Sequence, residues 1–130
     1  YGLLVIELIE NLIKNKNIDP NRIYISGLSM GGYGTFDLVS LRNDLFAAAA
    51  PICGGADLTL LEKALDVPFW IFHGDLDSIV PVEKSRDAFD FLIKKRDHHK
   101  YTEYTGVYHN SWENVFDEED FFMWLFSKSR

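Results

Sequence analysis

The chain has a single cysteine, no apolar run long enough to span a membrane, and fewer basic than acidic residues. Cys53 has no partner for a disulfide within the chain, so cysteine usage leaves the redox compartment open. The lack of a long apolar run excludes a membrane-spanning helix. The chain has 13 lysines and arginines against 20 aspartates and glutamates, and its formal net charge is -7. This balance argues against nucleic acid as the main partner, because phosphate binding requires a basic face.

What the chain does contain is typical of one folded domain, which we expect to span residues 1–130. Hydrophobic residues make up 47% and aromatic residues 15% of the chain, enough for a packed core. Neither repeats nor low-complexity segments interrupt it. We expect a soluble protein, and the sequence leaves cytoplasmic and secreted locations open.

Strand and helix patterns alternate along the chain. Apolar, aromatic or β-branched runs predict four strands, at 22–25, 46–53, 68–72 and 101–105. Helical patterns cover 1–16, 29–41, 58–65, 82–95 and 116–129. Strands that alternate with helices predict an α/β fold with a parallel sheet and right-handed crossovers.

Three of these helices have an apolar face that predicts how they pack. The residues that we expect to face the core are Leu4, Leu8, Leu12, Ile9 and Ile13 in the first helix, Ala88, Phe89, Leu92 and Ile93 in the fourth, and Phe121, Phe122, Trp124, Leu125 and Phe126 in the last. The acidic residues 117–120 suit a helix start, where they complement the dipole and cap N–H groups. We prefer this interpretation to a metal site.

Ser29 lies between two glycines at the predicted corner between a strand and a helix. A serine in this G-x-S-x-G pattern is typical of the nucleophile elbow of serine hydrolases, although a Gly-rich turn gives the same pattern. The corner forces a strained backbone on Ser29, and the missing Cβ atoms of Gly27 and Gly31 let strand and helix approach each other. The helix starts at Ser29, so its positive dipole end faces developing negative charge.

A serine hydroxyl needs an adjacent base that a third group orients, and candidates for both follow later strands. The loop after strand 68–72 contains Asp75 and Asp77, and the loop after strand 101–105 contains His109. The order serine, acid, histidine is the one that this architecture requires. If the strands are parallel, all three groups lie at their C-terminal ends, where open α/β sheets place their sites.

Two aspartates compete for the role of the acid. Asp77 is preferred, because it stands farther from the strand end and its side chain can turn toward the histidine loop. Asp75 is better explained as a residue that shapes the turn through backbone hydrogen bonds. Cys53 is interpreted as a small buried residue at a strand end rather than as a reactive thiol.

The four histidines have different sequence surroundings. Only His109 follows both a strand and a glycine turn, and we expect it to be the base. His73 ends a strand and is interpreted as a packed, hydrogen-bonded residue. His98 and His99 belong to the charged run 94–100, which predicts a solvated connection between a helix and a strand.

Five segments together resemble the C-terminal half of an α/β-hydrolase: 19–24, 27–34, 46–55, 73–81 and 109–112. The resemblance is to the esterase and predicted-peptidase branch, which includes feruloyl esterases and polyhydroxybutyrate depolymerase-like carboxylesterases. Its acid position, in a His-Gly-x-x-Asp loop, falls on Asp77. The resemblance implies a carboxylic ester hydrolase with Ser29, Asp77 and His109 as its triad, the backbone N–H of Met30 as an oxyanion donor, no cofactor and no metal.

The chain also departs from this family. A whole α/β-hydrolase has about eight strands and ~200 residues or more, whereas this chain has 130 and begins with Tyr1. We expect a truncated fold without the N-terminal strands, which also carry the second oxyanion donor. The elbow strand then lies at a sheet edge, which is a template for pairing. Besides a small-molecule ester substrate, we therefore expect a homo-oligomer or a complementing N-terminal fragment as partner; a domain cut from a longer protein is the alternative.

Two other functions stay open beside the esterase. A serine peptidase of the prolyl-oligopeptidase kind uses the same triad, and a fragment that is weakly active or non-catalytic without its partner has the same sequence features. Trp112 is the candidate for substrate binding, as a residue that borders the acyl pocket. Packing against the final helix explains Trp112 equally well.

Overall fold

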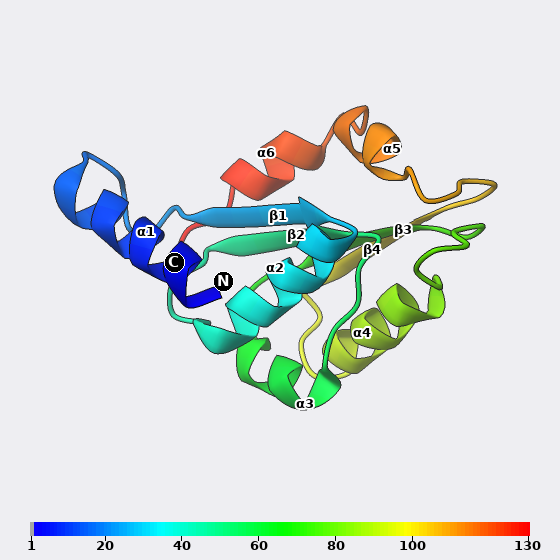
Figure 1. Ribbon diagram of the computed structural model, residues 1–130, viewed down its shortest axis with the longest axis horizontal. Helices are drawn as coiled ribbons and strands as arrows, with labels where there is room; N and C mark the ends of the chain where they lie inside the picture. The colour runs from blue at the N-terminus through cyan, green and yellow to red at the C-terminus, as the bar shows by residue number, and fades with distance from the viewer. Residues whose placement is uncertain (1) are drawn as a thin grey trace.

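The computed structural model describes residues 2–130, and its centre is a four-stranded parallel sheet in the order β1-β2-β3-β4 (Figure 1). The strands are β1 (Tyr24–Leu28), β2 (Ala48–Ile52), β3 (Trp70–Gly74) and β4 (Lys100–Tyr104). The predicted α/β class and the four predicted strands are confirmed, each with boundaries moved by a few residues. Parallel strands place all four carboxyl ends along one rim of the sheet.

Helices cover both faces of this sheet. They are α1 (Gly2–Asn15), α2 (Met30–Leu41), α3 (Leu58–Leu61), which a 3₁₀ turn η1 (Glu62–Ala64) continues, α4 (Glu83–Ile93), α5 (Trp112–Phe116) and α6 (Phe121–Phe126). In Figure 1 the helices α2, α3 and α4 lie on one side of the sheet, and α5 and α6 lie on the other. The expected first residue of the first helix, Tyr1, lies outside the described residues.

The core divides into two clusters because successive strand residues point to opposite faces. Ala49, Phe69 and Ile71 pack with the helices α1 to α4, whereas Trp70 and Phe72 pack with α5 and α6. The two inner strands β2 and β3 are therefore buried on both faces, which explains their nearly continuous apolar sequence.

The prediction of which residues of the first helix are buried is partly wrong. Ile9 and Ile13 do pack against the core, where they join the buried Ile6. Leu4 and Leu8, however, are 65% and 59% exposed, and Leu12 is exposed as well. The helix has two apolar stripes on different sides, and only the isoleucine stripe meets the sheet.

The expected final helix 116–129 is two helices, α5 and α6, separated by the acidic residues 117–120. Phe121 and Leu125 are buried as expected, but Phe122 and Phe126 are about half exposed. A helix of six residues presents only one narrow stripe to the sheet, so it cannot bury all five candidates.

The sequence predicts that the acidic residues 117–120 cap the start of a helix, but their side-chain contacts differ from this prediction. Asp120 occupies the position before α6, yet its side chain makes no capping hydrogen bond. Glu118 instead accepts a hydrogen bond of 2.7 Å from the hydroxyl of Tyr104 at the end of β4. The residues thus tie the α5–α6 connection to the sheet.

The sequence predicts that the charged run 94–100 is exposed to solvent, and for His99 this prediction is wrong. Its side chain is only 4% exposed, whereas the neighbouring His98 is exposed. The N–H of Phe69 donates to His99 Nδ1 at 3.2 Å, and His99 Nε2 donates to the carbonyl of Leu65 at 3.0 Å. The imidazole therefore joins the starts of β3 and β4 from inside the core.

The elbow strand β1 forms an edge of the sheet in the described part of the chain, as expected. Leu28 at its end is 40% exposed. Among residues 2–130, no helix combines the length and the apolar character that a membrane crossing requires.

Candidate active site

Ser29 occupies the sharp corner between β1 and α2. Its backbone has φ 55° and ψ −115°, a left-handed value of φ that is rare for a residue with a side chain. A Cβ on Gly27 would lie 2.3 Å from the carbonyl oxygen of Gly31, so the strand and the helix touch at this point. The strained elbow that the sequence predicts is therefore present.

The expectation for Gly31 needs correction. A Cβ on Gly31 would meet nothing within 4 Å, so its side is open and only the Gly27 side of the contact forbids a side chain. A second close approach joins Gly32 to Ile52 and Gly54, since a Cβ on Gly32 would lie 2.6 Å from the carbonyl oxygen of Ile52 and 3.0 Å from the Cα of Gly54. This contact holds the start of α2 against the end of β2.

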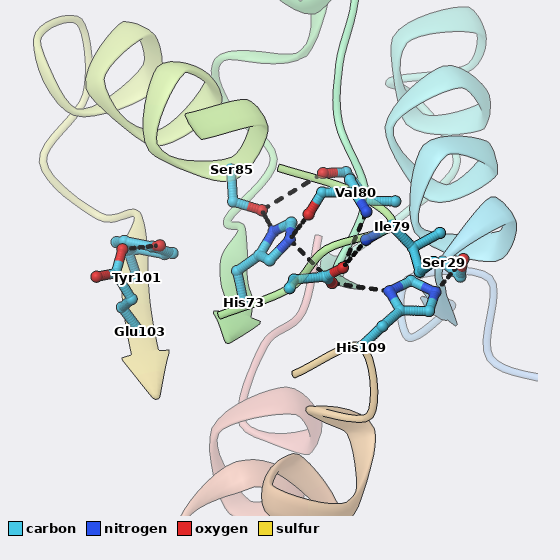
Figure 2. A network of polar contacts seen from close by, with 10 residues as sticks. Ser29, His73, Ile79, Val80, Ser85, Tyr101, Glu103 and His109 are labelled. Atoms are coloured by element: carbon cyan, nitrogen blue, oxygen red, sulfur yellow. Dashed lines mark hydrogen bonds and ion pairs between the residues drawn. The ribbon is translucent and has the colours of Figure 1, made fainter. Parts of the chain in front are cut away.

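Three polar side chains meet at the C-terminal rim of the sheet, from the ends of β1, β3 and β4. Ser29 Oγ lies 2.9 Å from His109 Nε2, and His109 Nδ1 lies 2.7 Å from Asp77 Oδ2. Figure 2 shows Ser29 and His109 facing each other across this rim. Because a carboxylate only accepts, Nδ1 of His109 carries the hydrogen and Nε2 accepts from the serine hydroxyl.

Asp77 is buried, and its charge is compensated by hydrogen bonds. Oδ1 accepts from the N–H groups of Ile79 and Val80, both at 2.9 Å, while Oδ2 accepts from His109. Burial alone would raise the pKa of Asp77. The hydrogen bonds from His109 and from the two backbone N–H groups outweigh burial and lower this pKa below its usual value. Asp77 is therefore an anion at neutral pH.

Asp75 has a different role from Asp77. Its carboxylate accepts a hydrogen bond of 2.7 Å from the N–H of Gly106, which has a φ of 75°. Asp75 therefore links the loop after β3 to the turn after β4, as a loop-shaping residue does. The side chain that bonds to His109 is that of Asp77.

His73 is fully buried in β3 and hydrogen-bonded at both nitrogens, as expected from its position at a strand end. Nδ1 lies 2.7 Å from Ser85 Oγ on α4, and Nε2 lies 2.8 Å from the carbonyl oxygen of Val80. Nε2 is also 3.3 Å from Asp77 Oδ2. Figure 2 shows these contacts side by side with the His109 imidazole.

The two remaining candidates border the serine and the histidine. Met30 is the first residue of α2, and its backbone N–H has no acceptor among residues 2–130. The N–H of Ser29, in contrast, donates to the carbonyl of Ile52 at 2.9 Å. The ring of Trp112 stands perpendicular to that of His109, with 5.7 Å between ring centroids. Trp112 also packs against the core cluster beneath α5 and α6.

Cys53 lies beside Asp77 and His109, and one ligand atom of each of the three residues is within 4.8 Å of the others. Cys53 is fully buried and has a φ of 44°. Burial raises the pKa of its thiol, so the group is protonated at neutral pH. Since Asp77 and His109 bond to each other, this cluster is better suited to hydrogen bonding than to holding a metal ion.

Ser85 is the part of the site that sequence reasoning missed. It lies on α4, twelve residues after His73, and only its spacing of i, i+3 from the buried Val82 and Ala88 places it on the inner face of that helix. A serine on the buried face of an amphipathic helix is a signal for an internal hydrogen bond.

Comparisons with known proteins identify the family of this chain. The phospholipase/carboxylesterase family matches residues 3–123. A thermostable esterase of known structure is 43% identical, with a TM-score of 0.95 over 98% of this chain and 36% of that protein. The cutinase est1 of Thermobifida alba is 35% identical over 97 residues, which are 75% of this chain and 32% of the cutinase.

A further relative is the poly(3-hydroxyalkanoate) depolymerase C of Paucimonas lemoignei, 42% identical over 54 residues, or 42% of this chain and 13% of that protein. The chain thus spans between 13% and 36% of the length of these three relatives. The family match covers almost the whole chain, and the parallel sheet and the elbow serine agree with it. The chain therefore belongs to the phospholipase/carboxylesterase family of α/β-hydrolases.

Proposed function

We propose that this chain carries the catalytic triad of a serine hydrolase that cleaves carboxylic esters through an acyl-enzyme intermediate. The observation that supports this most is the continuous hydrogen-bonded chain from Ser29 through His109 to the ionised Asp77, at 2.9 Å and 2.7 Å. The strained backbone of Ser29 adds support, since such strain is found where surrounding structure holds a functional side chain.

In the first half of the reaction, Ser29 Oγ attacks the ester carbonyl carbon while His109 Nε2 takes the hydroxyl proton. Asp77 keeps His109 in the required tautomer and stabilises the imidazolium that forms. The negative charge moves to the carbonyl oxygen, toward the N–H of Met30, which has no acceptor in the described part of the chain, and the positive end of the α2 dipole. When the tetrahedral intermediate collapses, His109 returns the proton to the leaving alcohol.

In the second half, a water molecule attacks the acyl-serine. His109 takes a proton from this water, and the second tetrahedral intermediate collapses to release the carboxylic acid. His109 then gives the proton back to Ser29 Oγ, so the enzyme returns to its starting state. No cofactor takes part in this sequence.

Relatives suggest the class of substrate. Their names describe a cutinase, a poly(3-hydroxyalkanoate) depolymerase and a bifunctional acetylxylan esterase/xylanase, and the last of these names includes an activity on carboxylic esters. We therefore assign an ester carbonyl, rather than a particular acid or alcohol, as the group on which this chain acts. Trp112 borders the site beside His109 and is the candidate for contact with the acyl group.

The proposal also implies a partner for the elbow strand. The outer edge of β1 is unpaired within the described residues, and Met30 supplies one oxyanion donor. One missing oxyanion donor costs about 3 kcal/mol, or roughly a hundred- to a thousand-fold in rate. A second copy of the chain or a preceding segment that pairs with β1 would cover the edge and could bring the second donor.

The test is the replacement Ser29→Ala, measured with p-nitrophenyl acetate and with a fluorophosphonate probe that labels activated serines. We expect hydrolysis to fall to the background rate and labelling to disappear. Ser26→Ala, in the strand β1 that precedes Ser29, is the matched control and is expected to keep both ester hydrolysis and labelling. Labelling of Ser29→Ala at the rate of the unmodified chain excludes this nucleophile.

The same assay separates the other functions. Cleavage of a peptide amide faster than of p-nitrophenyl acetate assigns the chain to the peptidases. An unmodified chain that is folded and neither hydrolyses the ester nor takes up the probe has no competent triad on its own. If adding a preceding segment restores both ester hydrolysis and probe labelling, the lack of activity is due to the missing partner.

A further inference from the structure

We propose that His73 and Ser85 form a positioning pair that holds the carboxylate of Asp77 in place for His109. This inference rests on the proposed function, because it concerns the acid of the same triad. It extends the chain of polar contacts by two residues, from the rim of the sheet through His73 on β3, which lies 3.3 Å from Asp77, into helix α4. In Figure 2, Ser85 lies next to His73, and His109 lies to one side of both, beside Ser29.

The two oxygens of Asp77 have separate partners. Oδ1 is held by the N–H groups of Ile79 and Val80. Oδ2 receives the hydrogen bond from His109 and lies 3.3 Å from His73 Nε2. His73 therefore adds a second imidazole beside the oxygen that orients the base.

His73 also fixes the loop that carries Asp77. The peptide groups of Val80 are held on both sides, because its carbonyl accepts from His73 Nε2 while its N–H donates to Asp77 Oδ1. The imidazole and the carboxylate thus hold the Val80 peptide groups from two sides, and His73 Nε2 and Asp77 Oδ2 lie 3.3 Å apart. A displacement of His73 would move Asp77 directly and through Val80.

The partners of His73 decide which nitrogen carries its hydrogen. Nε2 faces a carbonyl oxygen and a carboxylate oxygen, which can only accept, so Nε2 is the donor. Burial lowers the pKa of His73 and keeps the imidazole neutral, which leaves Nδ1 as an acceptor. Ser85 Oγ, at 2.7 Å, must then donate to Nδ1, since its other neighbour, the Gly54 carbonyl, is 3.5 Å away.

A purely structural role does not require this chemistry. His73 and Ser85 are both fully buried, and burying polar groups costs free energy unless each is hydrogen-bonded. An apolar side chain of similar size would fill the same space without a donor. What the pair adds is an N–H that donates to the Val80 carbonyl and lies 3.3 Å from Asp77 Oδ2.

The decisive variants remove or keep this N–H. His73→Leu retains most of the volume and has no donor, whereas His73→Gln places an amide N–H near the position of Nε2. We expect His73→Leu to lower kcat about 10- to 100-fold with an unchanged KM, since small misplacement of catalytic groups costs about 100-fold. His73→Gln is expected to recover most of the loss. A structural role alone would lower thermal stability in His73→Leu and leave kcat per folded molecule unchanged.

Ser85→Ala tests the outer member of the pair without opening a large cavity. We expect a smaller loss of kcat than for His73→Leu, again without a change in KM. Ser40→Ala is the matched control, because Ser40 is a buried serine on α2 that makes no side-chain hydrogen bond among the described residues. Equal kcat values for Ser85→Ala and Ser40→Ala would remove Ser85 from the proposal.

Nuclear magnetic resonance gives a readout that does not depend on activity. In the unmodified chain, ¹⁵N shifts of His73 are expected to show a protonated Nε2 and an unprotonated Nδ1. The low-field proton between His109 and Asp77 is expected to weaken in His73→Leu and to persist in His73→Gln. The opposite tautomer, or an unchanged proton signal in every variant, overturns the proposal even if His73→Leu fails to fold, because Ser85→Ala reports on the same proton.

The outcomes separate this inference from the proposed function. If Ser29→Ala keeps its activity, the proposed nucleophile is wrong, while the NMR signals still decide whether His73 holds Asp77. If Ser29→Ala is inactive and His73→Leu keeps the kcat of the unmodified chain, the triad stands and the positioning pair is wrong.

Discussion

Asp77 divides its carboxylate between two tasks. One oxygen closes the loop by accepting two backbone N–H groups, and the other bonds to His109. The first task keeps the aspartate ionised, because hydrogen bonds to the charged form lower its pKa. The second task sets the tautomer of His109, so that its other nitrogen accepts from Ser29.

The neighbouring aspartates give a matched test of this assignment. Asp77→Asn has nearly the same shape, but its amide can present an N–H to His109 and so favour the wrong tautomer. We expect kcat for p-nitrophenyl acetate to fall about 10⁴-fold, the size known for such a change in a serine hydrolase triad. Asp75→Asn keeps an acceptor oxygen for Gly106 and is expected to retain its activity. Equal losses in the two variants would contradict the assignment of Asp77.

At the scale of elements, the contact between β1 and α2 creates the elbow. The strand and the helix approach so closely at Gly27 that no side chain fits there, and this approach forces Ser29 into its left-handed backbone. Only one of the two flanking glycines is required for steric reasons.

Replacing each flanking glycine by alanine tests this difference. Gly27→Ala is expected to lower the free energy of unfolding by about 3 kcal/mol, because the new Cβ meets backbone atoms that cannot move aside. Gly31→Ala is expected to raise it by about 0.5–1 kcal/mol, since alanine is the better helix residue and its side is open. Urea unfolding measures both, and similar losses in the two variants would refute the steric account.

At the scale of the whole molecule, His99 makes stability depend on pH. Burial, followed by the charge of the adjacent His98, lowers the pKa of His99 from its usual 6.5 to about 4. Between these values the unfolded chain binds a proton that the folded chain does not. The free energy of unfolding therefore falls as the pH drops from 6.5 to 4, by about 3 kcal/mol in total.

The two adjacent histidines separate this effect from that of the other groups. His99→Asn is expected to flatten the fall in urea-unfolding free energy over this pH range. His98→Asn, at the exposed neighbouring position, is expected to keep most of it. A fall of equal size in both variants would show that His99 is not its source.

The open edge of β1 is expected to make the isolated chain associate. Sedimentation velocity at increasing concentration should reveal species larger than the monomer, because unpaired backbone groups beside exposed apolar side chains favour pairing. Leu28→Lys puts a charge at this edge and is expected to reduce association. Leu41→Lys, at an exposed site on α2, is the control. A compact monomer of the unmodified chain at all concentrations contradicts the partner requirement.

The amino-acid sequence alone determined the features that depend on neighbouring residues. The corner at Ser29, the alternation of strands and helices, and the order of Ser29, Asp77 and His109 are local patterns, and parallel strands bring such loop residues to one rim. The convergence of these three side chains could therefore be expected from the sequence.

The tertiary structure decided which side of each element is buried and which distant groups share a hydrogen bond. Leu8 and Ile9 are equally apolar, yet only the isoleucine stripe packs on the sheet. His99 lies in a charged run but is buried, and His73 reaches Ser85 on another element. Burial and hydrogen bonding of this kind depend on how whole elements dock, and the sequence around a single residue does not encode that docking.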